Sequence, residues 1–143
     1  MKKVSNTITI DAPIDEVFKF ISKPTKLIEV WPSFIEAKDV VRLPNGGTKF
    51  NWKYKMAGMT FEGTSEDIDF INGERVVSKQ EGGIDAKVTW QLQEEGGGTK
   101  VMLETEYTVP VPLLGNLAEN FIVKANDREG ATILVNFKDR LET

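Results

Sequence analysis

Large apolar side chains occupy every second position of the segment Thr48 to Met56, which reads TKFNWKYKM. They are Phe50, Trp52, Tyr54 and Met56. The positions between them are mostly lysine. A β-strand turns successive side chains to opposite faces, so this strand has one aromatic face and one polar face. An aromatic face of this kind either packs into a core or binds an apolar molecule.

Tryptophan and tyrosine add hydrogen-bonding groups to this face, because a buried indole N–H or phenol O–H usually finds a partner. Polar points inside an apolar chamber are typical of a small-molecule site. We expect Trp31 and Phe34 near the mouth of such a chamber, either as a gate or as a structural plug. The candidate cavity residues are Trp31, Phe34, Trp52, Tyr54, Met56, Phe61, Trp90, Tyr107 and Phe121. The sequence leaves open whether they line a cavity or fill it.

Acid–base and metal chemistry have few residues to draw on, because the chain contains no cysteine and no histidine. Thiol nucleophiles, thiolate ligands and imidazole bases are therefore absent. Glu104 and Glu106 share an outward face, and only the region Ser65 to Asp67 could turn a carboxylate inward. We predict no catalytic residues, no metal site and no cofactor. Catalysis by Tyr54, Tyr107 or an inward carboxylate stays an alternative.

Two glycine-rich loops, Asn45 to Lys49 and Glu94 to Gly98, resemble phosphate cradles only superficially. The first precedes a strand instead of a helix and is not a Walker motif, so we expect both to be hairpin turns. Lys124, Asn126 and Arg128 could present a polar group to the cavity, but a solvated helix face is the favoured interpretation.

The bulk composition fits a single domain, 1–143, with 40% hydrophobic and 28% charged residues. The net charge of −4 and the lack of a basic run argue against nucleic-acid binding. No apolar stretch approaches the roughly 20 residues that span a bilayer, and the N-terminus lacks a secretory signal. We therefore expect a cytoplasmic protein without stable membrane insertion.

The first elements are a strand from Val4 to Ile10 and a short helix. Asp11 is the predicted N-cap of this helix, with Pro13 in its first turn. A second short helix is predicted from Thr25 to Val30, ending at Trp31-Pro32, because the residue before proline is disfavoured in a helix.

From Phe34 onward, alternating patterns and Asn-Gly or Gly-Gly turns predict six consecutive antiparallel strands. A change of parity predicts a β-bulge near Gly63 to Glu66. After Pro110 and Pro112 the pattern becomes helical, from Leu113 or Gly115 to Leu141. Gly130 predicts a kink in this helix or a close approach to the sheet.

These elements predict an α+β fold. It consists of a seven-stranded, strongly bent antiparallel sheet, two short helices after the first strand, and a long C-terminal helix across the concave face. The segment ITIDAPIDEVFKFISKPTKLIEVWPSF and the ending NFKDRL resemble the START-like (SRPBCC) superfamily of helix-grip proteins. The matching positions are Ala12, Pro13, Glu16, Val17, Phe18, Trp31, Pro32, Asn136, Phe137, Lys138 and Leu141. The most similar branch is the prokaryotic polyketide cyclase/dehydrase-like group, which includes proteins similar to the small G-type component of carbon-monoxide dehydrogenase.

The resemblance implies a cavity between sheet and helix that carries a lipid- or polyketide-like molecule. We therefore predict binding or transport of a small hydrophobic or amphipathic ligand. A protein–protein assembly or chaperone-cofactor module, with an unknown protein partner, is one alternative. A polyketide cyclase or dehydratase-type enzyme is the other.

Overall fold

The computed structural model describes residues 2–56, 58–108 and 116–142, with side chains in the last range described from residue 122 onward. It contains one antiparallel sheet in the order β1-β7-β6-β5-β4-β3-β2. The strands are β1 Lys2–Ile10, β2 Phe34–Arg42, β3 Thr48–Met56, β4 Met59–Ile71, β5 Arg75–Gly82, β6 Ala86–Glu95 and β7 Gly98–Tyr107. The helices are α1 Ile14–Ile21, α2 Pro24–Leu27 and α3 Asn116–Glu142. The predicted fold class is confirmed.

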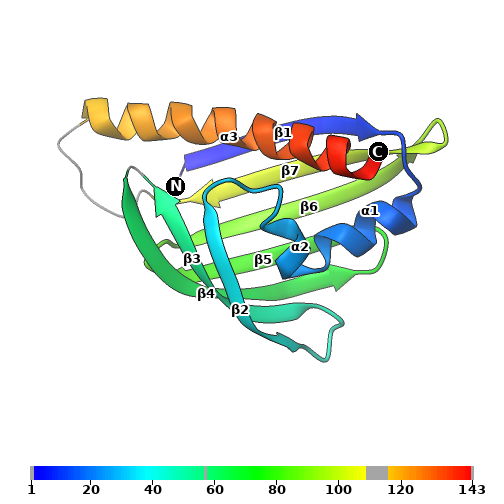
Figure 1. Ribbon diagram of the computed structural model, residues 1–143, viewed down its shortest axis with the longest axis horizontal. Coiled ribbons are helices and arrows are strands. Elements are labelled where there is room, and N and C mark those ends of the chain that lie inside the picture. Colours follow the sequence, from blue (N-terminus) through cyan, green and yellow to red (C-terminus); the bar gives the residue numbers. More distant parts are fainter. Residues whose placement is uncertain (1, 57, 109–115, 143) are drawn as a thin grey trace.

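The sheet curves so that its two ends approach each other around one concave face (Figure 1). The long helix α3 runs along β1, while α1 and α2 close the opposite part of the concave face. Chain order explains this arrangement. Six strands joined by tight turns cannot cover their own apolar face, and α3 is the one element long enough to lie across it.

The start of α1 differs from the prediction. Its N-cap is Pro13, whose extended backbone (φ −62°, ψ 146°) delays the first helical residue to Ile14. Asp11 is therefore too far upstream to cap the helix. Its backbone N–H instead donates to Glu142 Oε2 at 2.8 Å, which ties the end of β1 to the end of α3. The second helix is also shorter than predicted and begins at Pro24.

The predicted bulge in β4 exists, but it lies further along the strand. Gly63 pairs regularly with Trp52 of β3, and the register with β5 shifts only between Asp67 and Asp69. Ile68, the extra residue, is 49% exposed, and the shift returns Phe70 to the inward face. The parity change was a correct signal, but both Ser65 and Asp67 precede it and keep their inward orientation.

The inward face of β3 is buried as the alternation predicted, except that Tyr54 is only half-buried. Trp52 lies flat across Gly63, and a Cβ at Gly63 would overlap the indole ring. Trp90, Phe137 and Trp31 lie in a separate buried cluster toward α1. The core therefore has two clusters, one around Trp90 and one around Trp52.

Gly130 brings α3 close to β1. A Cβ at this position would overlap the Asn6 amide and lie 3.2 Å from Val4 Cγ1, so the close approach that the glycine predicted is the feature observed. Further along the helix, Lys138 Nζ donates to the Thr9 carbonyl at 2.9 Å. These contacts fix both the rotation of α3 and its distance from the edge strand β1.

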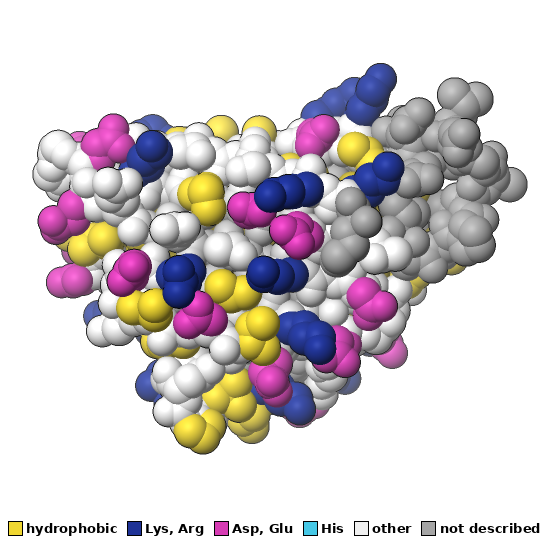
Figure 2. Space-filling model, turned by 180° about the vertical axis from the view of Figure 1, so that it is seen from behind, with side chains coloured by type: hydrophobic (Ala, Val, Ile, Leu, Met, Phe, Trp, Pro, Cys, Tyr) yellow, Lys and Arg dark blue, Asp and Glu magenta, His cyan; other side chains and the backbone are white. Residues whose placement is uncertain are grey.

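The side of the molecule opposite to the view of Figure 1 carries charged groups of both signs, with scattered hydrophobic side chains between them (Figure 2). The outward lysine Lys53 of β3 lies 3.6 Å from both Glu36 and Glu62. Arg75 forms a tighter pair with Asp69, at 2.8 Å. Exposed pairs of this kind contribute little stability each, about 0–1 kcal/mol, but they keep the outward face well solvated.

Candidate functional site

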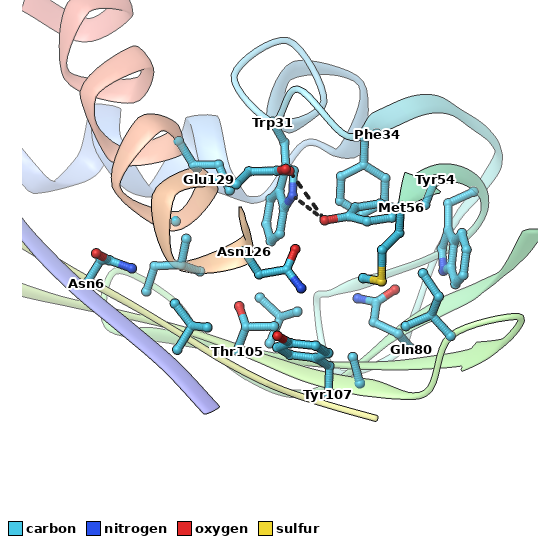
Figure 3. Close-up of a pocket in the computed structure, with 18 residues that line it drawn as sticks. Asn6, Trp31, Phe34, Tyr54, Met56, Gln80, Thr105, Tyr107, Asn126 and Glu129 are labelled. Carbon is cyan, nitrogen blue, oxygen red and sulfur yellow. Dashed lines mark hydrogen bonds between the residues drawn. The ribbon is translucent and has the colours of Figure 1, made fainter. Parts of the chain in front are cut away.

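A cavity of about 70 Å³ remains between α3 and the inward face of the sheet. Its walls come from β1, β3, β5, β6, β7 and α3, together with the segment before β2. The sequence-predicted residues that line it are Trp31, Phe34, Trp52, Tyr54, Met56 and Tyr107. Most of the remaining wall is aliphatic, and Figure 3 shows Met56 projecting into the middle of the space.

Three predicted site residues lie elsewhere or cannot be placed. Phe61 pairs with Tyr54 across β3 and β4 and packs half-buried against the cluster around Trp52, without lining the cavity. Trp90 is 1% exposed and sits in the core beside Trp31 and Phe137, where its ring centroid lies 5.5 Å from that of Phe137. The side chain of Phe121 lies outside the described residues.

An aromatic series borders the cavity from the α2 side to β3. Phe34 stands edge-on to both Trp31 and Tyr54, with centroids 5.0 Å and 4.9 Å apart. Tyr54 in turn contacts Trp52, at 6.3 Å. Such edge-to-face contacts add to the stability gained from burial and hold the rings in fixed orientations. The wall on this side is therefore rigid.

A hydrogen-bonded chain ends this series on the helix. Trp31 Nε1 donates to the Tyr54 hydroxyl at 3.2 Å, and that hydroxyl donates to Glu129 Oε1 at 3.3 Å (Figure 3). Glu129 Oε1 also accepts from the backbone N–H of Ser33 at 3.2 Å, and Glu129 Oε2 accepts from the Ser33 hydroxyl. One carboxylate of α3 is thus linked to the segment before β2 and to β3.

Sequence reasoning did not single out Glu129. The signal was available in Gly130, because the residue that touches the sheet fixes which face of α3 points inward. Asn126 and Ile133 lie four residues before and three after Gly130, on the same helix face, and Glu129 adjoins them. Asn126 does line the cavity, whereas Lys124 and Arg128 are exposed to solvent as expected.

The environment of Tyr54 changes its acidity. Its hydroxyl is enclosed by protein, and this burial is the main cause that raises the pKa of the phenol well above its ordinary value of 10.0. The neighbouring carboxylate of Glu129 raises the pKa further. Tyr54 therefore stays protonated and serves as a hydrogen-bond donor, not as a source of protons.

A second buried polar group involves the carboxylate that the sequence allowed to turn inward. Asp67 is 7% exposed, and its Oδ2 accepts from the Thr48 N–H at 2.8 Å while its Oδ1 accepts from the Ser78 hydroxyl at 2.7 Å. Asn45 Nδ2 donates to the Asp67 carbonyl at 2.8 Å, and Asn45 Oδ1 accepts from Gly47 N–H. Asp67 thus anchors the β2–β3 hairpin, and the Asn45 loop is the turn that was predicted.

Within the described ranges, no group of three or more acidic, histidine or cysteine side chains is placed to hold a metal ion. No helix in the same ranges is both long and apolar enough to cross a bilayer. The chemistry of the cavity therefore rests on its aromatic wall, its amides and hydroxyls, and the single carboxylate of Glu129.

Comparisons with known proteins agree with this architecture. A family profile described as "Polyketide cyclase / dehydrase and lipid transport" matches residues 1–142. No match was found among curated proteins.

Among solved structures, TTHA0849 from Thermus thermophilus superposes with a TM-score of 0.84 at 21% identity, covering 98% of this chain and 97% of that one. The Zhui aromatase/cyclase from Streptomyces sp. R1128 gives 0.82 at 15% identity, covering 99% and 93%. A START superfamily protein from Mycobacterium smegmatis gives 0.78 at 12% identity, covering 98% and 97%. The superfamily resemblance seen in the sequence is confirmed, and at these identities the structural likeness concerns the fold.

Replacement of Glu129 tests its role as the link between helix and sheet. We expect Glu129→Ala to lower the free energy of unfolding by about 2–3 kcal/mol, because the donors of Ser33 and Tyr54 lose their charged acceptor. Glu129→Gln keeps one acceptor oxygen and should cost less. Chemical denaturation gives the values, with Asp127→Ala on the exposed side of α3 as the control. Equal effects of Glu129→Ala and Asp127→Ala would contradict the assignment.

The raised pKa of Tyr54 predicts a pH dependence. Between the ordinary pKa of 10.0 and the higher folded value, the folded state holds a proton that the unfolded state has released. This contribution to stability is complete below pH 10 and is lost as the pH rises above it. Tyr107→Phe leaves Tyr54 as the one tyrosine of the chain, and its ultraviolet titration should show tyrosinate only as the protein unfolds. Ionisation of the folded variant at the ordinary pKa would refute this.

Proposed function

The chain belongs to the polyketide cyclase / dehydrase and lipid transport family, and from this premise we propose that it binds a small apolar or amphipathic molecule beneath α3. The observation that carries the proposal is the cavity itself. Protein interiors normally pack as densely as organic crystals, and voids larger than a water molecule are few. Here the unfilled space lies at the aromatic face and is bordered by polar side chains, as in small-molecule sites.

Rigid walls support a binding role. A preorganised site spends less of its binding free energy on ordering side chains. Phe34 is fixed by edge-on contacts to Trp31 and Tyr54, and Tyr54 is fixed by its hydrogen bonds. Met56 is the flexible element of the lining, because its unbranched thioether changes rotamer easily. A ligand would meet three fixed walls and one adaptable side chain.

A cyclase- or dehydratase-type activity is the second candidate, and the Tyr54–Glu129 pair is the observation that bears on it. An effective general acid or base has a pKa near the working pH. Burial and Glu129 instead raise the pKa of Tyr54, away from neutrality. The pair is therefore better suited to orienting a bound molecule by hydrogen bonding than to transferring a proton.

Filling the cavity tests the proposal. Ala86 lines the space from β6, so Ala86→Phe places a ring where the ligand would lie. The adjacent Lys87 is exposed on the opposite face, and Lys87→Phe adds the same ring outside. We expect 4-fluorotoluene to bind the native protein and Lys87→Phe, and to bind Ala86→Phe at least about tenfold more weakly.

Fluorine NMR line broadening of 4-fluorotoluene measures this binding, and circular dichroism verifies that both variants are folded. Failure of the native protein to bind 4-fluorotoluene would count against the proposal. So would retention of binding by folded Ala86→Phe, because the probe would then occupy another place.

A further inference from the structure

Three side chains that line the cavity carry buried polar atoms without a hydrogen-bond partner among the described residues. They are Trp52 at Nε1, Gln80 at Oε1 and Asn126 at Nδ2. Buried polar groups in native proteins are nearly always paired, since an unpaired one has lost its water and gained nothing in return. Three such atoms around one cavity indicate that something inside it completes their bonding.

Trp52 makes the least ambiguous demand. The indole nitrogen can only donate, and Trp52 is 4% exposed, so its partner must be an acceptor inside the protein. Gln80 adds a second point, because its Nε2 donates to the Ser65 hydroxyl at 3.0 Å and leaves its other amide atom free. The Ser65 hydroxyl can donate or accept, so Gln80 can offer either amide group to the cavity.

Asn126 completes the set from the opposite wall. Figure 3 shows its side chain projecting from α3 toward Tyr107 and Thr105, while Gln80 approaches from the sheet. Oxygen atoms on a bound molecule would therefore meet amide groups from both layers. Such bonds fix the orientation of a ligand whose remaining surface contacts only apolar side chains.

The charge of the lining restricts the ligand further. None of the described lining residues is lysine or arginine, and the one carboxylate is that of Glu129. Lys2, which falls on the inward register of β1 opposite Tyr107, is not among the lining residues. A ligand carboxylate would lose its water, find no cation and be repelled by Glu129. The site therefore disfavours acids, including fatty acids.

The size of the cavity sets an upper limit. Its volume of about 70 Å³ is smaller than the about 150 Å³ engineered cavity that holds benzene. A single ring fits only when Met56 turns aside, which an unbranched side chain does at low cost. A fused polycycle or a sterol would require α3 to leave its contacts at Gly130 and Glu129.

We propose that the cavity selects a neutral, single-ring molecule bearing an oxygen acceptor, such as a phenol or a cyclic ketone, with the oxygen bound by Trp52. This inference rests on the proposed binding function and narrows its ligand class. The apolar body of the ligand lies against Met56 and the aromatic wall. Asn126 and Gln80 hold additional ligand oxygens or hydroxyl groups.

A matched probe series tests the inference by isothermal titration calorimetry. Toluene, p-cresol and p-toluate share one ring and one methyl group and differ only in a hydrogen, a hydroxyl or a carboxylate. We expect p-cresol to bind at least about tenfold more tightly than either of the others, as one additional buried hydrogen bond allows. Trp52→Phe should bring p-cresol to within about threefold of toluene. Phe50→Leu, on the same strand face but outside the lining, should keep the preference.

Asn126→Leu provides a second variant should Trp52→Phe fail to fold, and it should also weaken p-cresol binding selectively. Equal binding of toluene and p-cresol would overturn the inference and leave the binding function intact, because water molecules would then satisfy the polar atoms. Tightest binding of p-toluate would overturn it as well. Absence of binding by all three probes would overturn the proposed function along with the inference.

Discussion

The cavity depends on the carboxylate of Glu129. Gly130 brings one side of α3 into close contact with β1, and Glu129 bonds to Ser33 and Tyr54 on the other side. A helix held on both sides cannot settle further into the concave sheet, so the aromatic face between these contacts stays incompletely covered. The space is a consequence of where the helix is attached, and not of missing side-chain volume in the sheet.

The same attachment determines the chemistry of the space. Glu129 occupies the one carboxylate of the lining in structural bonds, and it helps to keep Tyr54 protonated. What remains for a ligand are neutral donors and acceptors, chiefly the indole of Trp52 and the amides of Gln80 and Asn126. A chamber of this composition suits the holding of a neutral molecule better than acid–base chemistry near neutral pH.

Strand alternation and turn residues were enough to predict the seven strands, because both signals are local to the segments that carry them. Trp52 and Trp90 have the same local signal, yet Trp52 lines the cavity and Trp90 is core. The difference lies in what packs opposite, Phe137 for Trp90 and the region of Asn126 for Trp52, which no pattern within a strand reveals. Glu129 was missed for a similar reason, since the hydrophobic pattern of α3 changes phase and leaves its inward face undefined until the contact at Gly130 is known. Asp11 failed as a cap because the backbone of Pro13 postponed the helix.

The most direct measurement is a high-resolution crystal structure of the protein grown with p-cresol. The account predicts density for one ring between α3 and the inward faces of β3 and β7, with its hydroxyl within hydrogen-bonding distance of Trp52 Nε1 and with Met56 turned aside. A structure in which α3 has closed onto Trp52 and removed the space would contradict it. So would a cavity that contains only ordered water molecules on Trp52, Gln80 and Asn126 at saturating p-cresol.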